Sequence, residues 1–335
     1  MERRAGRVLT LYTITPRRAV EGGRITLQGS GFTSGDVFPH VTIGGARADV
    51  SSLSSRRVIL TVPGELDGGD LPIRFEDVPE APADTPALVS IGKPWATGLH
   101  QVDNPVFDEA GKLYVTYSGS RGQESPVSIF RVTRQGTREP FATGIVNATS
   151  MTIGPDGALY VSSRFEGMVH RVDADGTHEP IATDLGVPCG LAFDRDGWMY
   201  VGDRSGTIFR VKDGKTQTFA TVPASVAAFH LAMSPGGDLY VAAPTLAAYD
   251  RIFRITQDGE TTSLPFVFGR PQGLAFDGQG VLHVVDALAW ASGVYRIAEG
   301  QAPELSITGA GLIGIAFGPA GELVVCSNDT AYRFD

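Results

Sequence analysis

Residues that could bind a metal ion recur at matched positions in the second part of the chain. Eight residues before each of six turn glycines lies one set: Asp103, Thr149, Cys189, Phe229, Gln272 and Ile313. A hard cation such as calcium takes about six to eight oxygen ligands, counting waters. This set offers few of them, namely Asp103, its neighbour Asn104, and Gln272.

A second set of matched positions lies six residues after the same glycines: Tyr117, Ser163, Asp203, Ala243, Asp286 and Ser327. Asp203 and Asp286 could add oxygens to a metal site, but a single Asp after a strand also caps a loop. We therefore expect no metal cofactor. If the protein holds a divalent, calcium-like cation, we expect Asp103, Asn104, Asp203 and Asp286 to bind it.

The sequence also contains residues suited to an anion site and to a nucleophilic site. Arg164 and Arg204 occupy equivalent positions four residues after a tyrosine, and such a pair could hold a carboxylate or a sugar acid. Cys189 has no obvious histidine partner, although His230 lies one repeat away and could approach it. The six histidines show no zinc spacing. The catalytic residues, if there are any, stay unknown.

The elements that position these side chains are repeats. An apolar stretch, a turn ending in Gly and an apolar pair recur six times, anchored at Gly111, Gly157, Gly197, Gly237, Gly280 and Gly321. The glycines are 40 to 46 residues apart. Each unit contains four short runs rich in β-branched and aromatic residues, without helical periodicity. Four strands in about 40 residues is the repeat of a β-propeller blade, so the repeats predict a six-bladed ring around a channel.

The sixth unit stops after its third strand, at residues 332–335. Its missing fourth strand has a counterpart earlier in the chain, because the pattern of 92–98 matches that of 139–144. We expect residues 92–98 to close the last blade and so remove two sheet edges. One Arg per blade follows the apolar pair, which we interpret as a scaffold feature that bonds neighbouring carbonyls or turn aspartates. Cys189 and Cys326 fall in opposite blades and should not form a disulfide.

Residues 10–91 follow a different pattern, after a short tail at 1–9. Their short strands and Gly/Pro turns predict an immunoglobulin-like β-sandwich. The division gives three segments: the tail, the sandwich and a propeller over 92–335. Because Gly92 already begins the closing strand, we expect the two domains to hold a fixed arrangement with a modest interface.

Both segments resemble known families. The motifs ITP, GGRITLQGSGF, IGG and LTVPG resemble the IPT/TIG family of immunoglobulin-like domains. The resemblance implies a spacer or docking module. The phrases PCGLAFDRDGWMYVGD and PQGLAFDGQGVLHVVD resemble NHL-type propellers and the gluconolactonase (senescence-marker) family. That family implies a channel metal held by a Glu, two Asn and an Asp, and Cys189 stands where an Asn would be expected.

Charge and composition limit the classes of partner that the protein can bind. The net charge is −9, and neither segment has the surplus of Lys and Arg that binding to nucleic acid requires. An anionic membrane surface is disfavoured for the same reason. The N-terminus lacks a long apolar stretch, so we expect a cytoplasmic protein as written, or a secreted or periplasmic one if an upstream leader is missing.

These observations predict an all-β protein that binds a small molecule or a protein at one channel mouth without catalysis. The alternative is a metal-dependent hydrolase of the lactonase type. The expected ligand site combines the polar residues named above: Asp103, Asn104, Arg164, Cys189, Asp203, Arg204, His230, Gln272 and Asp286.

Overall fold

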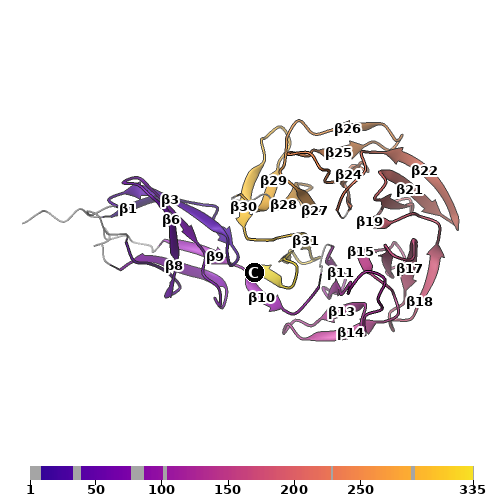
Figure 1. Cartoon of the computed structure of the whole chain (residues 1–335), viewed down its shortest axis with the longest axis horizontal. Helices are drawn as coiled ribbons and strands as arrows, with labels where there is room; N and C mark the ends of the chain where they lie inside the picture. The colour runs from indigo at the N-terminus through magenta and orange to yellow at the C-terminus, as the bar shows by residue number, and fades with distance from the viewer. Residues whose placement is uncertain are drawn as a thin grey trace, which may run out of the picture.

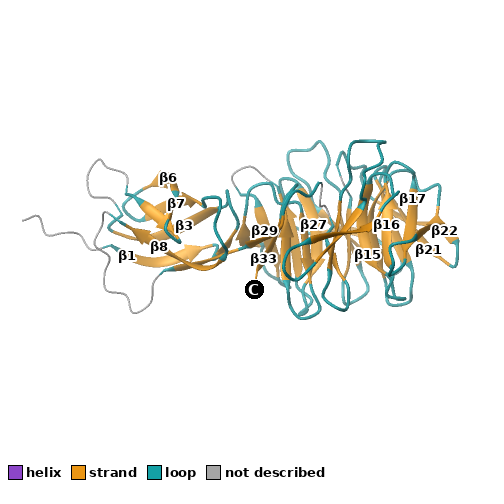
Figure 2. Ribbon diagram, turned by 90° about the horizontal axis from the view of Figure 1, so that it is seen from below, coloured by secondary structure: helices purple, strands orange, loops and turns teal. Residues whose placement is uncertain are grey.

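The computed structural model describes residues 9–32, 39–76, 87–100, 104–227, 229–287 and 291–334. Every regular element in these ranges is a β-strand. Figure 1 shows a ring of sheets with a smaller sandwich beside it, and Figure 2 shows the ring edge-on, with loops on both of its faces. No helix among the described residues is long and apolar enough to cross a membrane.

The ring is a six-bladed propeller, as predicted. Blades 1 to 3 each contain four antiparallel strands: β11 (Val106–Phe107), β12 (Leu113–Thr116), β13 (Ile129–Val132) and β14 (Arg138–Ala142); β15 (Ala148–Ile153), β16 (Leu159–Ser163), β17 (Met168–Val172) and β18 (His178–Ala182); β19 (Pro188–Phe193), β20 (Met199–Asp203), β21 (Thr207–Lys212) and β22 (Lys215–Thr221).

Blades 4 to 6 complete the ring with these strands: β23 (His230–Met233), β24 (Leu239–Ala242), β25 (Ile252–Ile255) and β26 (Thr261–Ser263); β27 (Pro271–Phe276), β28 (Leu282–Asp286), β29 (Gly293–Ile297) and β30 (Glu304–Thr308); β31 (Gly314–Phe317), β32 (Leu323–Cys326), β33 (Ala331–Phe334) and β10 (Lys93–Ala96). Strand β10 pairs with β33, where Lys93 faces Arg333 and Pro94 faces Tyr332. The fourth strand of blade 6 therefore comes from the start of the propeller segment, and the ring is closed by strand pairing.

The turn between the first and second strands is the same in every blade. All six anchor glycines have φ between +74° and +89°, a region that side chains with a Cβ rarely adopt. The repeated Gly of the sequence is therefore set by this turn.

The propeller core is divided among the gaps between blades. Each of the six gaps contains its own cluster of buried apolar side chains. Cys189 belongs to the cluster between blades 3 and 4, and Cys326 to the one between blades 6 and 1. Both are buried free thiols, so the prediction that they are not bonded to each other is confirmed.

The repeated arginines stabilise the blades. Arg171 donates to the turn residue Asp156 at 2.8 Å, and Arg254 donates to Asp238 at 2.7 Å in the equivalent turn. Arg131 instead pairs with Glu139 on the next strand at 2.9 Å. Within these blades the scaffold interpretation is confirmed.

The front domain is a two-sheet sandwich. One sheet has the order β1-β3-β7-β6, and the other continues as β2-β9-β8-β4-β5. Their bounds are β1 (Thr10–Thr15), β2 (Arg18–Ala19), β3 (Arg24–Ser30), β4 (Val41–Ile43), β5 (Ala46–Arg47), β6 (Asp49–Leu53), β7 (Arg57–Thr61), β8 (Gly69–Phe75) and β9 (Leu88–Ile91). Ile25, Leu60 and Ile73 are among the side chains buried between the sheets.

Backbone pairing joins the front domain to the propeller. The two residues of β2 pair in parallel with β9 on one side and with β30, the outer strand of blade 5, on the other. The Tyr332 hydroxyl donates to Glu21 at 2.6 Å across the same junction. One nine-stranded sheet thus runs through both domains and fixes their arrangement. A fixed arrangement is what the sequence predicted, and the modest size of the interface stays a prediction. The segment boundaries at residues 9 and 91 stay predictions.

Candidate functional site

The innermost strands of the six blades surround the channel (Figure 1). The loop that leads into each innermost strand comes from the previous blade. These loops lie on the same face of the ring as the loops between the second and third strands of each blade. The described residues of the predicted ligand site come from these two kinds of loop or from the strand ends beside them. We call this face the mouth.

A polar contact spans the channel at the mouth. The Nδ1 atom of His230, the first residue of β23, lies 3.2 Å from Oδ1 of Asn104, which lies just before β11. These strands belong to blades 4 and 1, which are opposite each other in a six-fold ring. Of the predicted site residues, Asn104 and His230 are therefore brought together.

His230 is fully buried, and its environment keeps it neutral. Burial lowers the pKa of His230 to about 4, and the nearby Gln272 side chain opposes this shift. Gln272 is itself 7% exposed, at the start of β27. Among the described residues, two buried polar atoms of this group have no hydrogen-bond partner, His230 Nε2 and Asn104 Nδ2. Unpaired buried polar atoms are rare in folded proteins.

The two aspartates at the strand ends are occupied by the protein's own backbone. Asp203 accepts a hydrogen bond from the Val187 amide at 2.7 Å and another from the Ser205 hydroxyl. Asp286 accepts from the amides of Gly269 and Arg270 at 2.9 and 2.7 Å. Both carboxylates thus hold the loop that leads into their own blade.

The two arginines also hold loops together. Arg164 Nη2 lies 3.3 Å from Ser118 Oγ in blade 1, and Arg204 Nη2 donates to the Val226 carbonyl at 3.0 Å. Each therefore links its blade to a loop of a neighbouring blade. Cys189 is 1% exposed in the apolar cluster with Phe229, an environment typical of a structural thiol.

The described residues do not fit the cation site that the family resemblance implies. They contain no group of three or more His, Cys, Asp or Glu side chains able to hold a metal ion. Asp203 and Asp286 already accept hydrogen bonds from backbone amides, and Asp103 lies outside the described residues.

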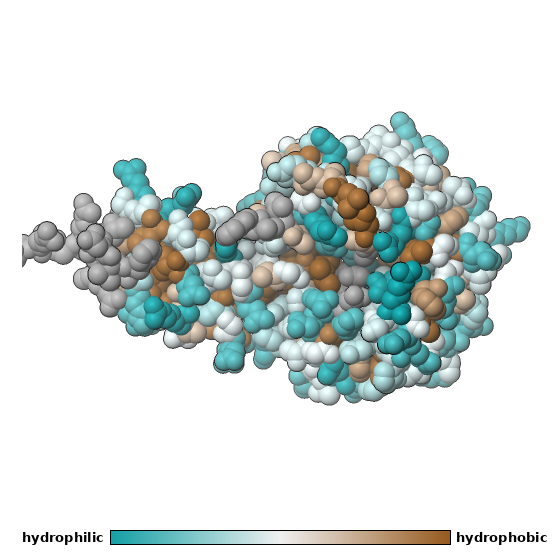
Figure 3. All heavy atoms as spheres, viewed as in Figure 1, coloured by the Kyte–Doolittle hydropathy of each residue, from teal (hydrophilic) through white to brown (hydrophobic). Residues whose placement is uncertain are grey.

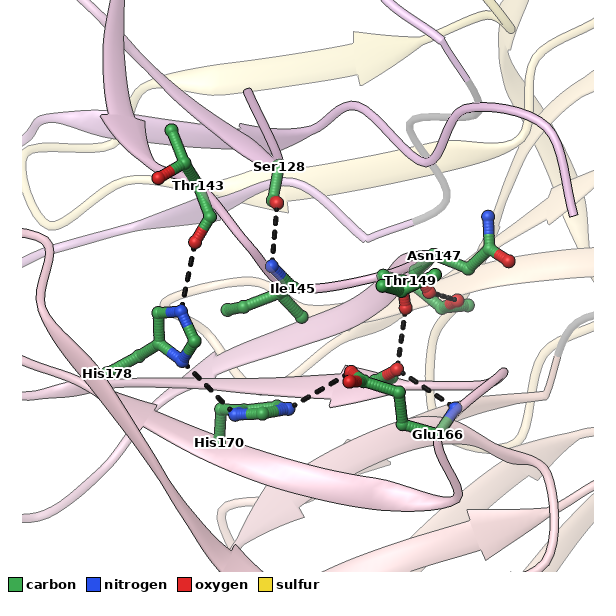
Figure 4. Close-up of polar contacts among 10 residues, drawn as sticks. Ser128, Thr143, Ile145, Asn147, Thr149, Glu166, His170 and His178 are labelled. Atoms are coloured by element: carbon green, nitrogen blue, oxygen red, sulfur yellow. Dashed lines mark hydrogen bonds and ion pairs between the residues drawn. The ribbon is translucent and has the colours of Figure 1, made fainter. Parts of the chain in front are cut away.

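A histidine pair in blade 2 was not predicted from the sequence. Figure 4 shows the chain of contacts: His178 Nε2 lies 2.9 Å from the Thr143 carbonyl, His178 Nδ1 lies 3.3 Å from His170 Nδ1, and His170 Nε2 lies 3.3 Å from Glu166. Burial lowers the pKa of His170, while Glu166 opposes the shift. The signal in the sequence was that both histidines flank one hairpin turn, since β17 pairs with β18.

An apolar rim at the mouth was not predicted either. Seven large apolar side chains of the described residues are exposed, and five of them lie on mouth loops: Phe165, Val226, Leu246, Tyr249 and Val267. The last four border blade 4, and we call them the blade 4 rim. Figure 3 shows apolar side chains gathered on this face beside the centre of the ring. The rim lies next to His230 and Gln272 along the chain.

Comparison with known protein families gives two matches. Residues 9–84 match the IPT/TIG domain family. Residues 187–211 match the family described as strictosidine synthase-like, N-terminal. No curated protein matches the chain.

Solved structures resemble the chain at low identity. An auxiliary nutrient binding protein from Bacteroides thetaiotaomicron is 12% identical, with a TM-score of 0.56, over 98% of this chain and 97% of its own. A gluconolactonase from Xanthomonas campestris is 17% identical, with a TM-score of 0.59, over 72% of this chain and 88% of its own. Virginiamycin B lyase from Staphylococcus aureus is 18% identical, with a TM-score of 0.51, over 69% of this chain and 78% of its own.

These likenesses show the fold, and they include proteins named for binding as well as proteins named for catalysis. The chain is therefore an all-β protein in which an IPT/TIG domain precedes a six-bladed propeller of the kind also seen in gluconolactonases.

Proposed function

We propose that the protein binds a small ligand at the channel mouth and does not turn it over. The observation that carries this proposal is the pair of unpartnered buried atoms, His230 Nε2 and Asn104 Nδ2. A buried polar atom without a partner costs about 1–3 kcal/mol, and a ligand that pairs with it recovers that energy on binding. The exposed apolar rim around the same mouth supports the proposal, because such patches mark binding surfaces.

The alternative, a metal-dependent lactonase, has less support from the site. Hydrolysis of that type uses a metal to polarise the carbonyl or to activate water. Both oxygens of Asp286 already accept hydrogen bonds from backbone amides, and those of Asp203 accept from the Val187 amide and the Ser205 hydroxyl. Both carboxylates therefore already anchor the loops that lead into their blades.

The IPT/TIG domain acts in this proposal as a spacer or docking module. Its support is the attachment through β2, which adds a strand to the outer edge of blade 5. The junction lies at the outer wall of the ring, whereas the proposed ligand site lies at its centre (Figure 1). The front domain can therefore contact a partner without covering the mouth.

The test is hydrolysis of a panel of sugar lactones with added calcium, magnesium, manganese or zinc. We expect no turnover above the rate of the buffer with any of the four ions. Turnover that is abolished both by a chelator and by Asp103→Ala, and that survives in Asp258→Ala, would refute the noncatalytic proposal. Asp258 is an exposed control that makes no side-chain hydrogen bond among the described residues.

A further inference from the structure

The Asn104–His230 pair leaves a definite hydrogen-bonding pattern unpaired. If the His230 Nδ1–H group donates to Asn104 Oδ1, the unpaired atoms are an acceptor, His230 Nε2, and a donor, Asn104 Nδ2–H. If the amide is turned over, His230 Nδ1 accepts, and the unpaired atoms are the Nε2–H donor and the Oδ1 acceptor. Either way, one donor and one acceptor are left.

This pattern selects for the charge of the ligand. A carboxylate has only acceptors and an ammonium has only donors, so each would leave one of the two atoms facing a like partner. A hydroxyl or a carboxamide carries both functions and can pair with both atoms. Since burial keeps His230 neutral, the pair offers no positive charge to attract an anion either.

The loops of blade 4 expose apolar side chains on which an apolar portion of the ligand can lie. Tyr249 is 61% exposed and Leu246 is 90% exposed, on the loop that follows β24 in the blade of His230. Val226 lies four residues before His230, and its amide donates to the Pro244 carbonyl, which joins the two loops. Outside the mouth loops, the exposed large apolar side chains of the described residues are Tyr12 and Leu88, both in the front domain.

We propose that the ligand is an uncharged amphipathic small molecule. Its head, a hydroxyl or carboxamide group, pairs with Asn104 and His230, and its apolar body lies on the blade 4 rim. This inference rests on the proposed binding function and names the chemistry of the same site.

The experiment is calorimetric titration with probes that share an eight-carbon body, below their micelle concentrations: octyl glucoside, octanamide, octanoate and octylammonium. Glucose serves as a head without a body. We expect the two uncharged amphiphiles to bind at least tenfold more tightly than the two ions and than glucose, since one hydrogen bond or a few buried methylenes each account for about that factor.

Matched variants locate the site. Asn104→Leu should weaken the uncharged probes at least tenfold, and His230→Phe tests the same pair if the first variant does not fold. Tyr249→Ser should weaken them severalfold, whereas Tyr12→Ser, which alters a tyrosine that is 65% exposed on the front domain, should not.

The outcomes distinguish failure of this inference from failure of the proposed binding function. Tighter binding of octanoate or octylammonium would overturn the inference and leave a ligand site at the mouth. Failure of every probe to bind, or equal effects of Tyr249→Ser and Tyr12→Ser, would also overturn it. Lactone turnover would instead overturn the proposed function.

Discussion

Replacing the buried aspartates tests whether they hold loops or bind a cation. Asp286 accepts hydrogen bonds from two backbone amides, at 2.9 and 2.7 Å, and is 3% exposed. Asp203 accepts one from a backbone amide at 2.7 Å and one from the hydroxyl of Ser205, an exposed residue. Because the Ser205 hydroxyl can turn to water, Asp203→Ala loses essentially one charge-assisted hydrogen bond and Asp286→Ala loses two.

A hydrogen bond to a charged group contributes about 1.5–3 kcal/mol. Asp203→Ala should therefore lower the free energy of unfolding by about 1.5–3 kcal/mol. For a domain of this size that corresponds to a fall in Tm of about 3–12 °C. Asp286→Ala should cost more, because it leaves two amides unpaired. The corresponding Asn variants keep a carbonyl oxygen as acceptor and should lose less than the Ala variants.

The assay is thermal and urea unfolding of each variant, with and without calcium, with exposed Asp258→Ala as control. We expect the order Asp286→Ala, Asp203→Ala, control, from the largest loss to the smallest, unchanged by calcium. A loop-holding role is refuted if both variants unfold like the control in a chelator but lose a calcium-dependent rise in Tm that the unmodified protein shows. That result would make the carboxylates metal ligands.

Three further predictions concern His230, the domain junction and the two cysteines. The pKa of His230 falls from 6.5 to about 4 on folding, so the unfolded chain takes up a proton first as the pH drops. The free energy of unfolding should therefore decline between about pH 6.5 and 4, by up to about 3 kcal/mol. Urea midpoints that fall equally in His230→Gln would contradict this. Glu21→Ala and Tyr332→Phe remove the same interdomain hydrogen bond, so a double-mutant cycle should give a coupling energy of about 1–3 kcal/mol, and additive losses would refute it. Burial raises the pKa of the Cys326 thiol, and Cys189 is equally buried, so both should resist alkylation until the chain unfolds and then label as two thiols; a mass consistent with a disulfide would disprove this.

Much of the fold could be predicted because it follows from local patterns. The glycines near 40-residue spacing mark a turn that needs positive φ, and the short apolar runs between them can only be strands. The incomplete last repeat predicted that the chain just before the first repeat pairs with β33, because a closed ring needs a fourth strand there. These features depend on residues close together in the chain, and a single sequence displays them.

The candidate site depended on the tertiary structure, because its contacts join residues that no local pattern relates. Asn104 and His230 are 126 positions apart and meet only when the ring closes and places blades 1 and 4 opposite each other. The sequence showed carboxylates at Asp203 and Asp286, but whether their oxygens face the channel or the amides of their own loops is decided by loop conformation. The pairing of β2 with β30 likewise could not be predicted, because the sequence of an edge strand does not specify which strand it pairs with. It became visible only with both domains in place.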